Sequence, residues 1–380
     1  MGFGCAITFG KSLIPLPEKL QGWLVEARVE MELSAPTRYA LRFEDDICDG
    51  RHEVADDLTF EKDTDLGLFV PIEGGGYECL VLGPITKVRS SSVLGGPGSW
   101  VEFHGEDRRA RMGRITVQSK HKGKASAVAS KIIDAYEFKA DVQDTLIEHD
   151  EQKLPLTQSA TDLAFVEDVA RRNNMDFWLE YKVVPKLPAL DVEITGCLKT
   201  SPERKQSLGA PVPVPTLTPD DALELRVAPP GDICANITKF DTRINYERPA
   251  SARGFTMSAD QQKKVVEQLV EPPAPLDADK IIPVEGIKRE LAPVTKPTPE
   301  EAFLAQEAIV FEQSWFVEAD CSASFEQLGF VVRPHQIVKV SHAGEALSGA
   351  YQVMKATHVI NAADHLVDFL VRASGLGGRS

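Results

Sequence analysis

The 380-residue chain has few of the features that mark a metal site, a membrane anchor or a nucleic-acid interface. Its six cysteines form no CxxC motif and no clustered pair, which disfavours zinc and fits a reducing cytoplasm. No apolar run approaches the roughly 20 residues of a membrane span, and the first residues do not resemble a signal peptide. The formal net charge of -15 disfavours nucleic acid, because phosphate binding needs concentrated Lys and Arg.

Catalytic motifs are also missing. Gly10-Lys11-Ser12 ends like a phosphate-binding loop, but Cys5 stands where that loop needs its first glycine. Four of the eight histidines fall between residues 335 and 365, without an HExxH motif or paired cysteines. Chance placement in a β domain explains them better than a metal site. We therefore expect no catalytic residue, no cofactor and no metal.

Residues 156–181 predict a helix followed directly by a strand. Ser159 and Thr161 can each accept a free amide at a helix start, and Asp162 adds negative charge where the helix dipole is positive. Apolar residues then recur at helical spacing. Asn173–Asn174 suits the helix end, because Asn tolerates left-handed backbone. The aromatic residues that follow favour extended backbone.

Alternation of apolar and polar residues predicts strands through most of the remaining chain. The expected strands cover residues 24–31, 39–43, 79–88, 100–107, 222–227, 233–246, 315–319, 331–334, 337–340, 348–353, 357–360 and 365–372. Two more helices are expected, at residues 125–136 and from Pro299 to about Phe311. Proline-rich tracts at 211–219 and 272–299 separate these regions, because proline fits neither helix interiors nor central strands.

The segment 156–181 resembles the signature of the phage late control D family. These are the hub proteins of contractile phage tails, type VI secretion spikes and extracellular contractile injection systems. The matching positions, which we interpret as structural, include Gln158, Asp162, Phe165, Ala170, Arg171 and Trp178. Three positions depart from the family pattern, since Asn174 and His335 stand where members usually carry Gly and Phe103 stands where they carry Val. With gaps, the resemblance runs from about residue 6 to residue 374.

The resemblance implies an α+β protein, mostly β, in which two similar β-barrel-like hub domains and a helix-bearing insertion assemble as a trimeric ring. The implied domains are a first hub barrel (1–113), a helix-containing insertion with a proline-rich end (114–220), the start of the second barrel (221–255), a proline-rich segment and helix (256–312), the rest of the second barrel (313–375) and a flexible tail (376–380).

The function that the resemblance implies is a non-enzymatic baseplate hub. It would link a trimeric spike to a hexameric inner tube and adapt threefold to sixfold symmetry. The implied partners are two further copies of the chain, the spike protein and the inner tube protein. Tape-measure protein, wedge proteins and lumenal cargo are further candidates. The expected location is the cytoplasm during assembly and then a phage tail, tailocin or injection particle.

Two alternatives from other classes stay open. One is a tail-associated cell-wall hydrolase built on the hub scaffold, which would need paired carboxylates or an extra domain. The other is a carbohydrate-binding β protein, which would need exposed aromatic residues. Aromatic residues make up only 7% of the chain, so the second alternative is the weaker one.

Charge is distributed unevenly along the sequence. Residues 42–65 hold ten acids against three bases, whereas residues 108–124 hold seven bases and no acid. Ordinary solvent-exposed surface explains both charged runs as well as the interface hypothesis that follows. The sharper hypothesis places the basic run against a neighbouring subunit or spike and the acidic run along a channel or its rim. The candidate interface residues are Arg108, Arg109, Arg111 and Arg114, and the candidate channel residues are Asp45, Asp46, Asp56 and Asp57. Reversal of the first three arginines to Glu would then block assembly without unfolding the chain.

Overall fold

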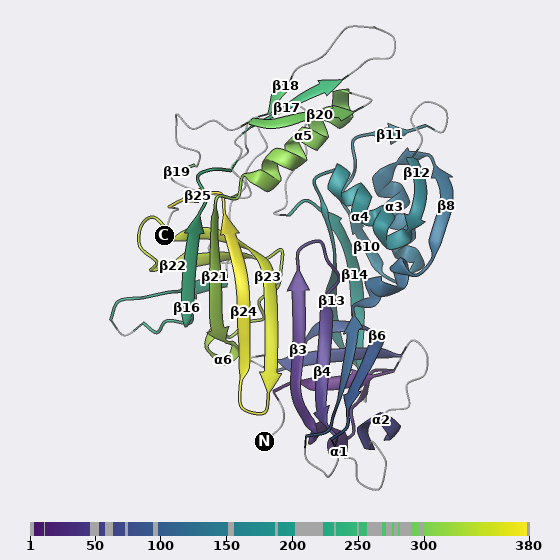
Figure 1. Ribbon diagram of the computed structural model, residues 1–380, viewed down its shortest axis with the longest axis vertical. Coiled ribbons are helices and arrows are strands. Elements are labelled where there is room, and N and C mark those ends of the chain that lie inside the picture. Colours follow the sequence, from purple (N-terminus) through teal and green to yellow (C-terminus); the bar gives the residue numbers. More distant parts are fainter. Residues whose placement is uncertain are drawn as a thin grey trace.

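The protein is mostly β, and most of its strands belong to one 13-stranded sheet (Figure 1). The computed structural model describes residues 4–10, 12–45, 53–57, 64–72, 75–93, 98–150, 156–186, 189–201, 223–231, 233–248, 251–256, 268–270, 276, 280–281, 290–296 and 299–377. Within these ranges, no helix is long and apolar enough to cross a membrane.

Two units of five strands with the same topology form the body of the sheet. The first unit consists of β3 (Leu24–Glu32), β4 (Arg38–Glu44), β5 (Asp65–Pro71), β6 (Tyr77–Ser91) and β7 (Trp100–Glu106). The second unit consists of β16 (Lys239–Ile244), β21 (Val317–Ser324), β22 (Ile337–Ser341), β23 (Gly349–Asn361) and β24 (His365–Ala373). In each unit the long fourth strand pairs first with the third strand and then with the fifth. The fifth strand pairs with the second, and the second with the first.

The two long strands bend at equivalent places. A β-bulge interrupts the ladder between Ile85 and Lys87 in β6, and another does so between Val353 and Lys355 in β23. A bulge adds one residue on one strand and bends it, which lets a single strand serve two partners. The second unit therefore repeats the first in strand order, direction and bulge position.

The two units join edge to edge rather than standing apart. The end of β23 pairs antiparallel with β3, from Lys355 opposite Glu32 to Asn361 opposite Glu26. We call this pairing the internal seam. Among the described strands no sheet closes on itself, so the expectation of two β-barrel-like domains is wrong in that respect. The physical reason is that the backbone groups at the edges of β23 and β3 form hydrogen bonds with each other. Neither strand is then available to close its own unit.

Shorter elements complete the two units. These are β1 (Ala6–Phe9) and β2 (Ile14–Pro15) beside β5, β15 (Leu223–Arg226) beside β22, the helices α1 (Glu18–Gln21), α2 (Glu53–Asp57) and α6 (Phe325–Leu328), and the 3-10 helix η1 (Arg108–Gly113). Another small sheet packs on a helix. It contains β17 (Ser251–Thr256), β18 (Gln268–Val270) and β20 (Glu290–Lys296) against α5 (Pro299–Gln313), while β19 (Lys280–Ile281) pairs with β25 (Gly375–Leu376).

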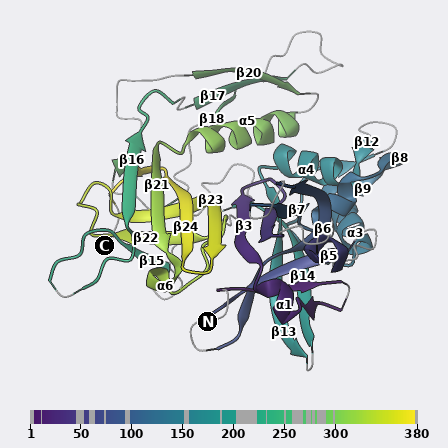
Figure 2. The same cartoon turned by 60° about the horizontal axis from the view of Figure 1, so that its bottom comes forward.

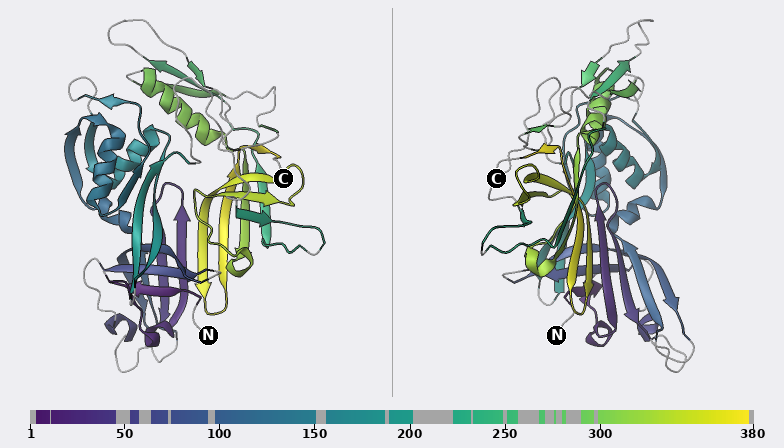
Figure 3. Two further views of the ribbon diagram at one scale, coloured as in Figure 1. Left: turned by 180° about the vertical axis from the view of Figure 1, so that it is seen from behind. Right: turned by 60° about the vertical axis from the view of Figure 1, so that its left-hand side comes forward.

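Residues 116–199 form an α/β insertion. Its elements are β8 (Thr116–His121), β9 (Gly123–Lys124), α3 (Ala125–Ala135), β10 (Lys139–Val142), β11 (Glu148–His149), β12 (Leu156–Thr161), α4 (Asp162–Arg172), β13 (Asp176–Lys186) and β14 (Ala189–Lys199). Figure 3 shows its helices beyond one end of the first unit, away from the second unit. Its buried core includes Ile133, Phe165 and Phe177 and continues into Phe69 and Leu82 of the first unit.

The predicted helix and the strand after it are confirmed, although Ser159 lies in the preceding strand β12 and not at the helix start. The Thr161 hydroxyl accepts a hydrogen bond from the Ala164 amide at 3.3 Å, which caps α4. Asn174 then takes a left-handed conformation with φ 54°, and β13 follows at once. The helices α3 and α5 also lie where the sequence predicts them.

One strand prediction near the C-terminus is wrong. Residues 331–334 form no strand, because the chain turns there into β22. His335 makes this turn with φ 72°, so the turn forms without the family's usual glycine. The strands predicted at 348–353 and 357–360 are one strand, β23, because its bulge bends the chain without breaking the ladder. The predicted strand 233–246 is shorter and begins at Lys239.

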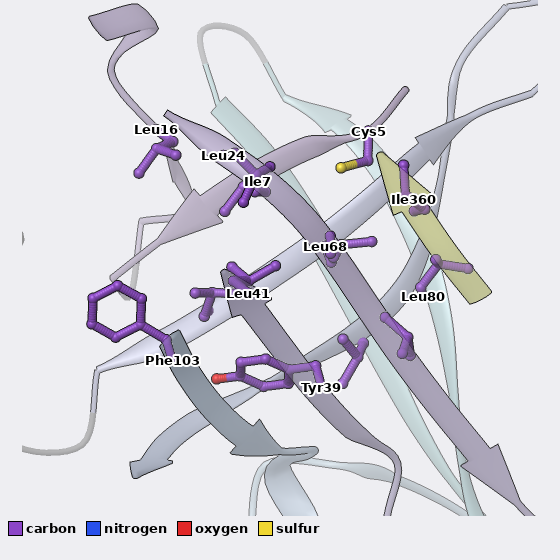
Figure 4. Close-up of a cluster of buried hydrophobic side chains, with 14 of the residues drawn as sticks. Cys5, Ile7, Leu16, Leu24, Tyr39, Leu41, Leu68, Leu80, Phe103 and Ile360 are labelled. Atoms are coloured by element: carbon purple, nitrogen blue, oxygen red, sulfur yellow. The ribbon is translucent and has the colours of Figure 1, made fainter. Parts of the chain in front are cut away.

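The cores of the two units meet at the internal seam. Figure 4 shows Leu41, Tyr39 and Phe103 of the first unit around Leu68 and Leu80. Ile360 lies in the same cluster although it comes from β23. Burial of a large aliphatic side chain contributes about 1.5–3 kcal/mol, so this contact holds the two units together.

Candidate assembly surface

The main candidate site is a broad charged face of the sheet rather than a pocket. It spans eight neighbouring strands in the order β16, β21, β24, β23, β3, β4, β7 and β6. Successive side chains point to opposite faces of a strand, and here one face is buried while the other is polar. We call the polar side the charged face.

Opposite charges alternate across the charged face. Arg28 Nε lies 2.8 Å from Glu30 Oε1, and Arg243 Nη2 lies 3.0 Å from Asp320 Oδ2. Lys239 Nζ lies 3.0 Å from Asp241 Oδ2. Each exposed pair contributes little to stability, about 0–1 kcal/mol. Their joint effect is a water-compatible surface.

The eight-strand sheet has two open edges. Among the described strands, β16 pairs only with β21, and residues 87–91 of β6 pair only with β7. The two edges lie on opposite sides of the molecule (Figure 2). An open edge presents backbone N–H and C=O groups that another strand can pair with. At the β6 edge Val88 is 46% exposed even though it lies on the otherwise buried face.

An aromatic–cationic cluster lies beside the β6 edge on the charged face. The guanidinium carbon of Arg42 lies 4.7 Å from the Trp100 ring centroid, and that of Arg89 lies 5.9 Å from it. Arg89 also approaches Glu102, with 3.8 Å between Nη1 and Oε2. Stacking on the indole orders both arginines, so this edge presents a locally basic rim.

The basic run is largely internal. Arg109 is 2% exposed and forms an ion pair with Asp107, with 2.7 Å between Nη2 and Oδ2. It also donates to the carbonyl oxygens of Phe177 at 2.7 Å and Ala35 at 2.8 Å. Arg109 thus ties the first unit to the insertion and cannot face a partner, which corrects its placement in a surface patch.

The neighbouring arginines are also committed to internal contacts. Arg108 and Arg111 both pair with buried Asp65, at 2.8 Å and 2.7 Å between nitrogen and oxygen. Only Arg114 of this set is exposed. Reversal of Arg108, Arg109 and Arg111 to Glu would therefore place unpaired acids beside Asp65 and Asp107, and we expect it to destabilise the chain instead of only blocking assembly.

The acidic run is not a continuous rim either. Asp45 is fully buried, and its Oδ2 accepts a hydrogen bond from the Val54 amide of α2 at 3.2 Å. It therefore holds a local helix instead of lining a channel. Asp46 lies outside the described residues. Asp56 is exposed on α2, and Asp57 is the last residue of that helix.

The signature residues form a buried network in the insertion. Gln158 donates from Nε2 to Asp162 Oδ1 at 2.7 Å, and Asp162 Oδ2 accepts from the Tyr136 hydroxyl at 2.8 Å. Phe165 and Ala170 are buried in the core around this network, whereas Arg171 is exposed. The arrangement fixes β12, α3 and α4 relative to one another, which supports a structural role for the signature.

Trp178, the last signature residue, connects the insertion to the second unit. Its ring stacks on His335 with 4.0 Å between ring centroids. Both ring nitrogens of His335 are inaccessible and have no hydrogen-bond partner among the described residues. Burial, followed by the charges of Arg109 and Arg372, lowers the pKa of His335 to about 3. His335 is thus a neutral packing group.

Sequence reasoning missed a histidine pair next to the internal seam. His358 donates from Nε2 to the Val332 carbonyl at 2.9 Å, since a carbonyl can only accept. Its Nδ1 therefore accepts from His365 Nε2 at 3.0 Å. Burial, followed by His365, lowers the pKa of His358 to about 3, and burial lowers that of His365 to about 4. Only the position of both residues around one hairpin could have hinted at the contact.

Nothing in the described ranges resembles a metal centre, since no three His, Cys, Asp or Glu side chains gather as ligands would. A cavity of about 610 Å³ lies where the first unit, the insertion and the second unit meet. Arg109, Trp178, Tyr181, Arg333 and His335 contribute to its lining. Three of these residues, Arg109, Trp178 and His335, make the contacts described above, so the cavity belongs to the junction itself.

Several solved structures have a similar fold. The tail protein from Neisseria meningitidis MC58 aligns over 99% of this chain and 98% of its own, with a TM-score of 0.62 and 10% identity. The 43 kDa tail protein of prophage MuSo2 from Shewanella oneidensis aligns over 97% of both chains, with a TM-score of 0.60 and 12% identity. The chain has the fold of phage tail proteins. Both alignments are nearly complete, so the two units and the insertion together make up this tail-protein fold.

The same fold extends to secretion systems. A component of the Escherichia coli type VI secretion system aligns over 94% of this chain and 76% of its own, with a TM-score of 0.51 and 13% identity. That protein is described as structurally similar to T4 bacteriophage tail proteins. No family model and no curated protein matches the sequence. At the level of fold, the resemblance inferred from the signature is confirmed.

Proposed function

We propose that this protein is a structural, non-enzymatic baseplate hub of a contractile tail or contractile injection system. Three copies would form a ring that seats a trimeric spike on one side and the first ring of a hexameric inner tube on the other. The ring would be assembled in the cytoplasm and become part of the particle. The tail-protein fold supports this general role.

One observation supports the adaptor role most directly, namely the duplication within the sheet. Each copy contributes two topologically equivalent units, so three copies present six equivalent units around one axis. Such a ring has threefold symmetry in sequence and approximate sixfold symmetry in backbone. A threefold spike and a sixfold tube could then bind opposite sides of one ring without a further adaptor.

The charged face supports a channel in this ring. Its ion pairs tolerate water, and its opposite face already carries the buried cores of both units. A ring that turned the charged face inward would enclose an aqueous passage lined by charges of both signs. Tape-measure protein or cargo would occupy this passage, and wedge proteins would contact the outside.

The test uses the purified full chain, alone and with the spike and tube proteins encoded beside it. Mass photometry measures the mass of the particle, and negative-stain electron microscopy gives its class averages. We expect a particle of three copies with a central hole, and a tube that begins on only one of its sides. Compact monomers in every mixture, or a ring that binds neither protein, would overturn the proposal.

A further inference from the structure

We infer that the open edge of β8 binds an extended acidic segment of another protein as an added strand. Among the described strands, β8 pairs only with β12, so its second edge presents backbone N–H and C=O groups without a partner strand. Figure 1 shows β8 at the outer margin of the insertion, on the side away from the second unit. The inference goes beyond the proposed ring, and its test uses the single chain.

The inward side of β8 holds the strand in place. His121 Nε2 lies 2.8 Å from Ser119 Oγ and 3.1 Å from Gln158 Oε1. The His121 ring also packs on Phe165 of α4, with 5.4 Å between ring centroids. β8 is therefore ordered before a partner arrives. A preformed edge loses less conformational entropy on binding than a mobile segment does.

The exposed side of β8 and the residues that flank the strand are basic. Arg114, Lys120 and Lys122 are exposed, and residues 108–124 contain no acid. Neither Lys120 nor Lys122 forms an ion pair with a described residue. The chain as a whole has a formal net charge of -15, so this basic strip is an exception on an acidic protein. Its charge favours a partner that carries carboxylates.

An apolar side chain lies next to the start of the strand. Ile115 is 72% exposed, more than any other large hydrophobic residue in the described ranges. Thr116 and Gln118 lie on the exposed face with Lys120 and are uncharged. A strand added at this edge would place every second side chain beside this face. The segment that fits best therefore has acids at alternate positions near Lys120 and an apolar residue near Ile115.

The same lysines disfavour a second copy of this chain as the occupant. Lysine is common on edge strands, because like charges keep two copies of an edge apart. Two β8 edges side by side would bring the bases of both strips together with no acid between them. An acidic strand replaces this repulsion by attraction, so the edge accepts one class of partner and rejects the other.

The test is binding of a labelled peptide of about ten residues, the length of a long strand, measured by fluorescence anisotropy. The probe alternates glutamate with threonine and valine, and we expect it to bind, whereas a peptide with lysine in place of glutamate should not. Lys120→Glu with Lys122→Glu in one chain should raise Kd at least about tenfold. Lys131→Glu with Lys139→Glu makes the same charge change at two other exposed lysines of the insertion and should change Kd by less than about twofold. Both variants should keep the circular dichroism spectrum of the wild type.

Methylation of peptide amides separates strand pairing from simple attraction of charges. Successive N–H groups of an extended peptide point to opposite edges, so methylation of the glutamate amides, or of all the other amides, blocks one edge only. We expect one of these two methylated probes to lose binding and the other to keep it. Binding of both, or loss of both, would overturn strand addition, and an equal Kd for the wild type and the Lys120 and Lys122 variant would overturn the site. Absence of binding at about 1 mM acidic peptide would overturn the inference altogether, whether or not the chain forms a ring.

Discussion

Acid should unfold this protein through its buried histidines before it titrates most carboxylates. His335, His358 and His365 have pKa values lowered to about 3, 3 and 4 in the folded state. An unfolded chain binds these protons with a pKa near 6.5. The unfolded state therefore holds more protons at intermediate pH, so stability is complete above pH 6.5 and falls as the pH drops toward 4.

The expected loss is large compared with the stability of the fold. Each histidine that is protonated only in the unfolded state costs about 1.4 kcal/mol per pH unit. Three such groups give about 4 kcal/mol per pH unit, or about 6 kcal/mol between pH 6.5 and pH 5. Domains of this kind are stable by about 5–15 kcal/mol. We therefore expect acid unfolding to begin near pH 5.

A matched pair of substitutions isolates one histidine. His335 and His342 both have left-handed backbone, with φ of 72° and 59°, but His342 is exposed. Asn accepts this conformation at both positions. His335→Asn should lower the slope of unfolding free energy against pH from about 4 to about 3 kcal/mol per unit, and His342→Asn is the control for an Asn placed in the same left-handed conformation.

The assay is urea unfolding monitored by tryptophan fluorescence at several pH values from 7.5 to 5. Protein concentrations are kept low, so that assembly does not contribute to stability. The comparison uses slopes, because loss of the Trp178 stack also lowers stability at every pH. Equal slopes for wild type and His335→Asn would refute the assignment of His335 as a neutral buried group.

Two further predictions concern the first unit. Arg109→Met should destabilise the chain by about 3–5 kcal/mol, because Asp107 would remain buried without its partner. In the same thermal denaturation, Arg114→Met at the surface should change the free energy of unfolding by no more than about 0.5 kcal/mol. Equal losses of stability in the two variants would show that the contacts of Arg109 stabilise the chain no more than those of an exposed arginine. Gly105→Ala would place a methyl group 2.1 Å from the Tyr39 ring and should cost about 1–3 kcal/mol, whereas the carbon added by Gly22→Ala meets nothing nearer than 3.5 Å. A Gly105→Ala protein as stable as Gly22→Ala would contradict the packing at that strand.

Local sequence patterns predicted local structure well. The cap at Thr161, the left-handed Asn174 and the start of β13 depend on residues within one short segment. Alternation likewise predicted the positions of most strands of the large sheet. Arg109 was misplaced because its partners at Ala35 and Phe177 lie 74 and 68 residues away in the sequence. A run of arginines in the sequence cannot show which one turns inward.

Edge pairing was the feature that sequence could least predict. The internal seam joins β3 to β23 across most of the chain length, and alternation says nothing about which edges meet. The same pattern is compatible with two closed barrels or with one shared sheet. Only the observed strand pairs distinguish these two arrangements. Among the described strands they form one open sheet, whose edges are available for further pairing.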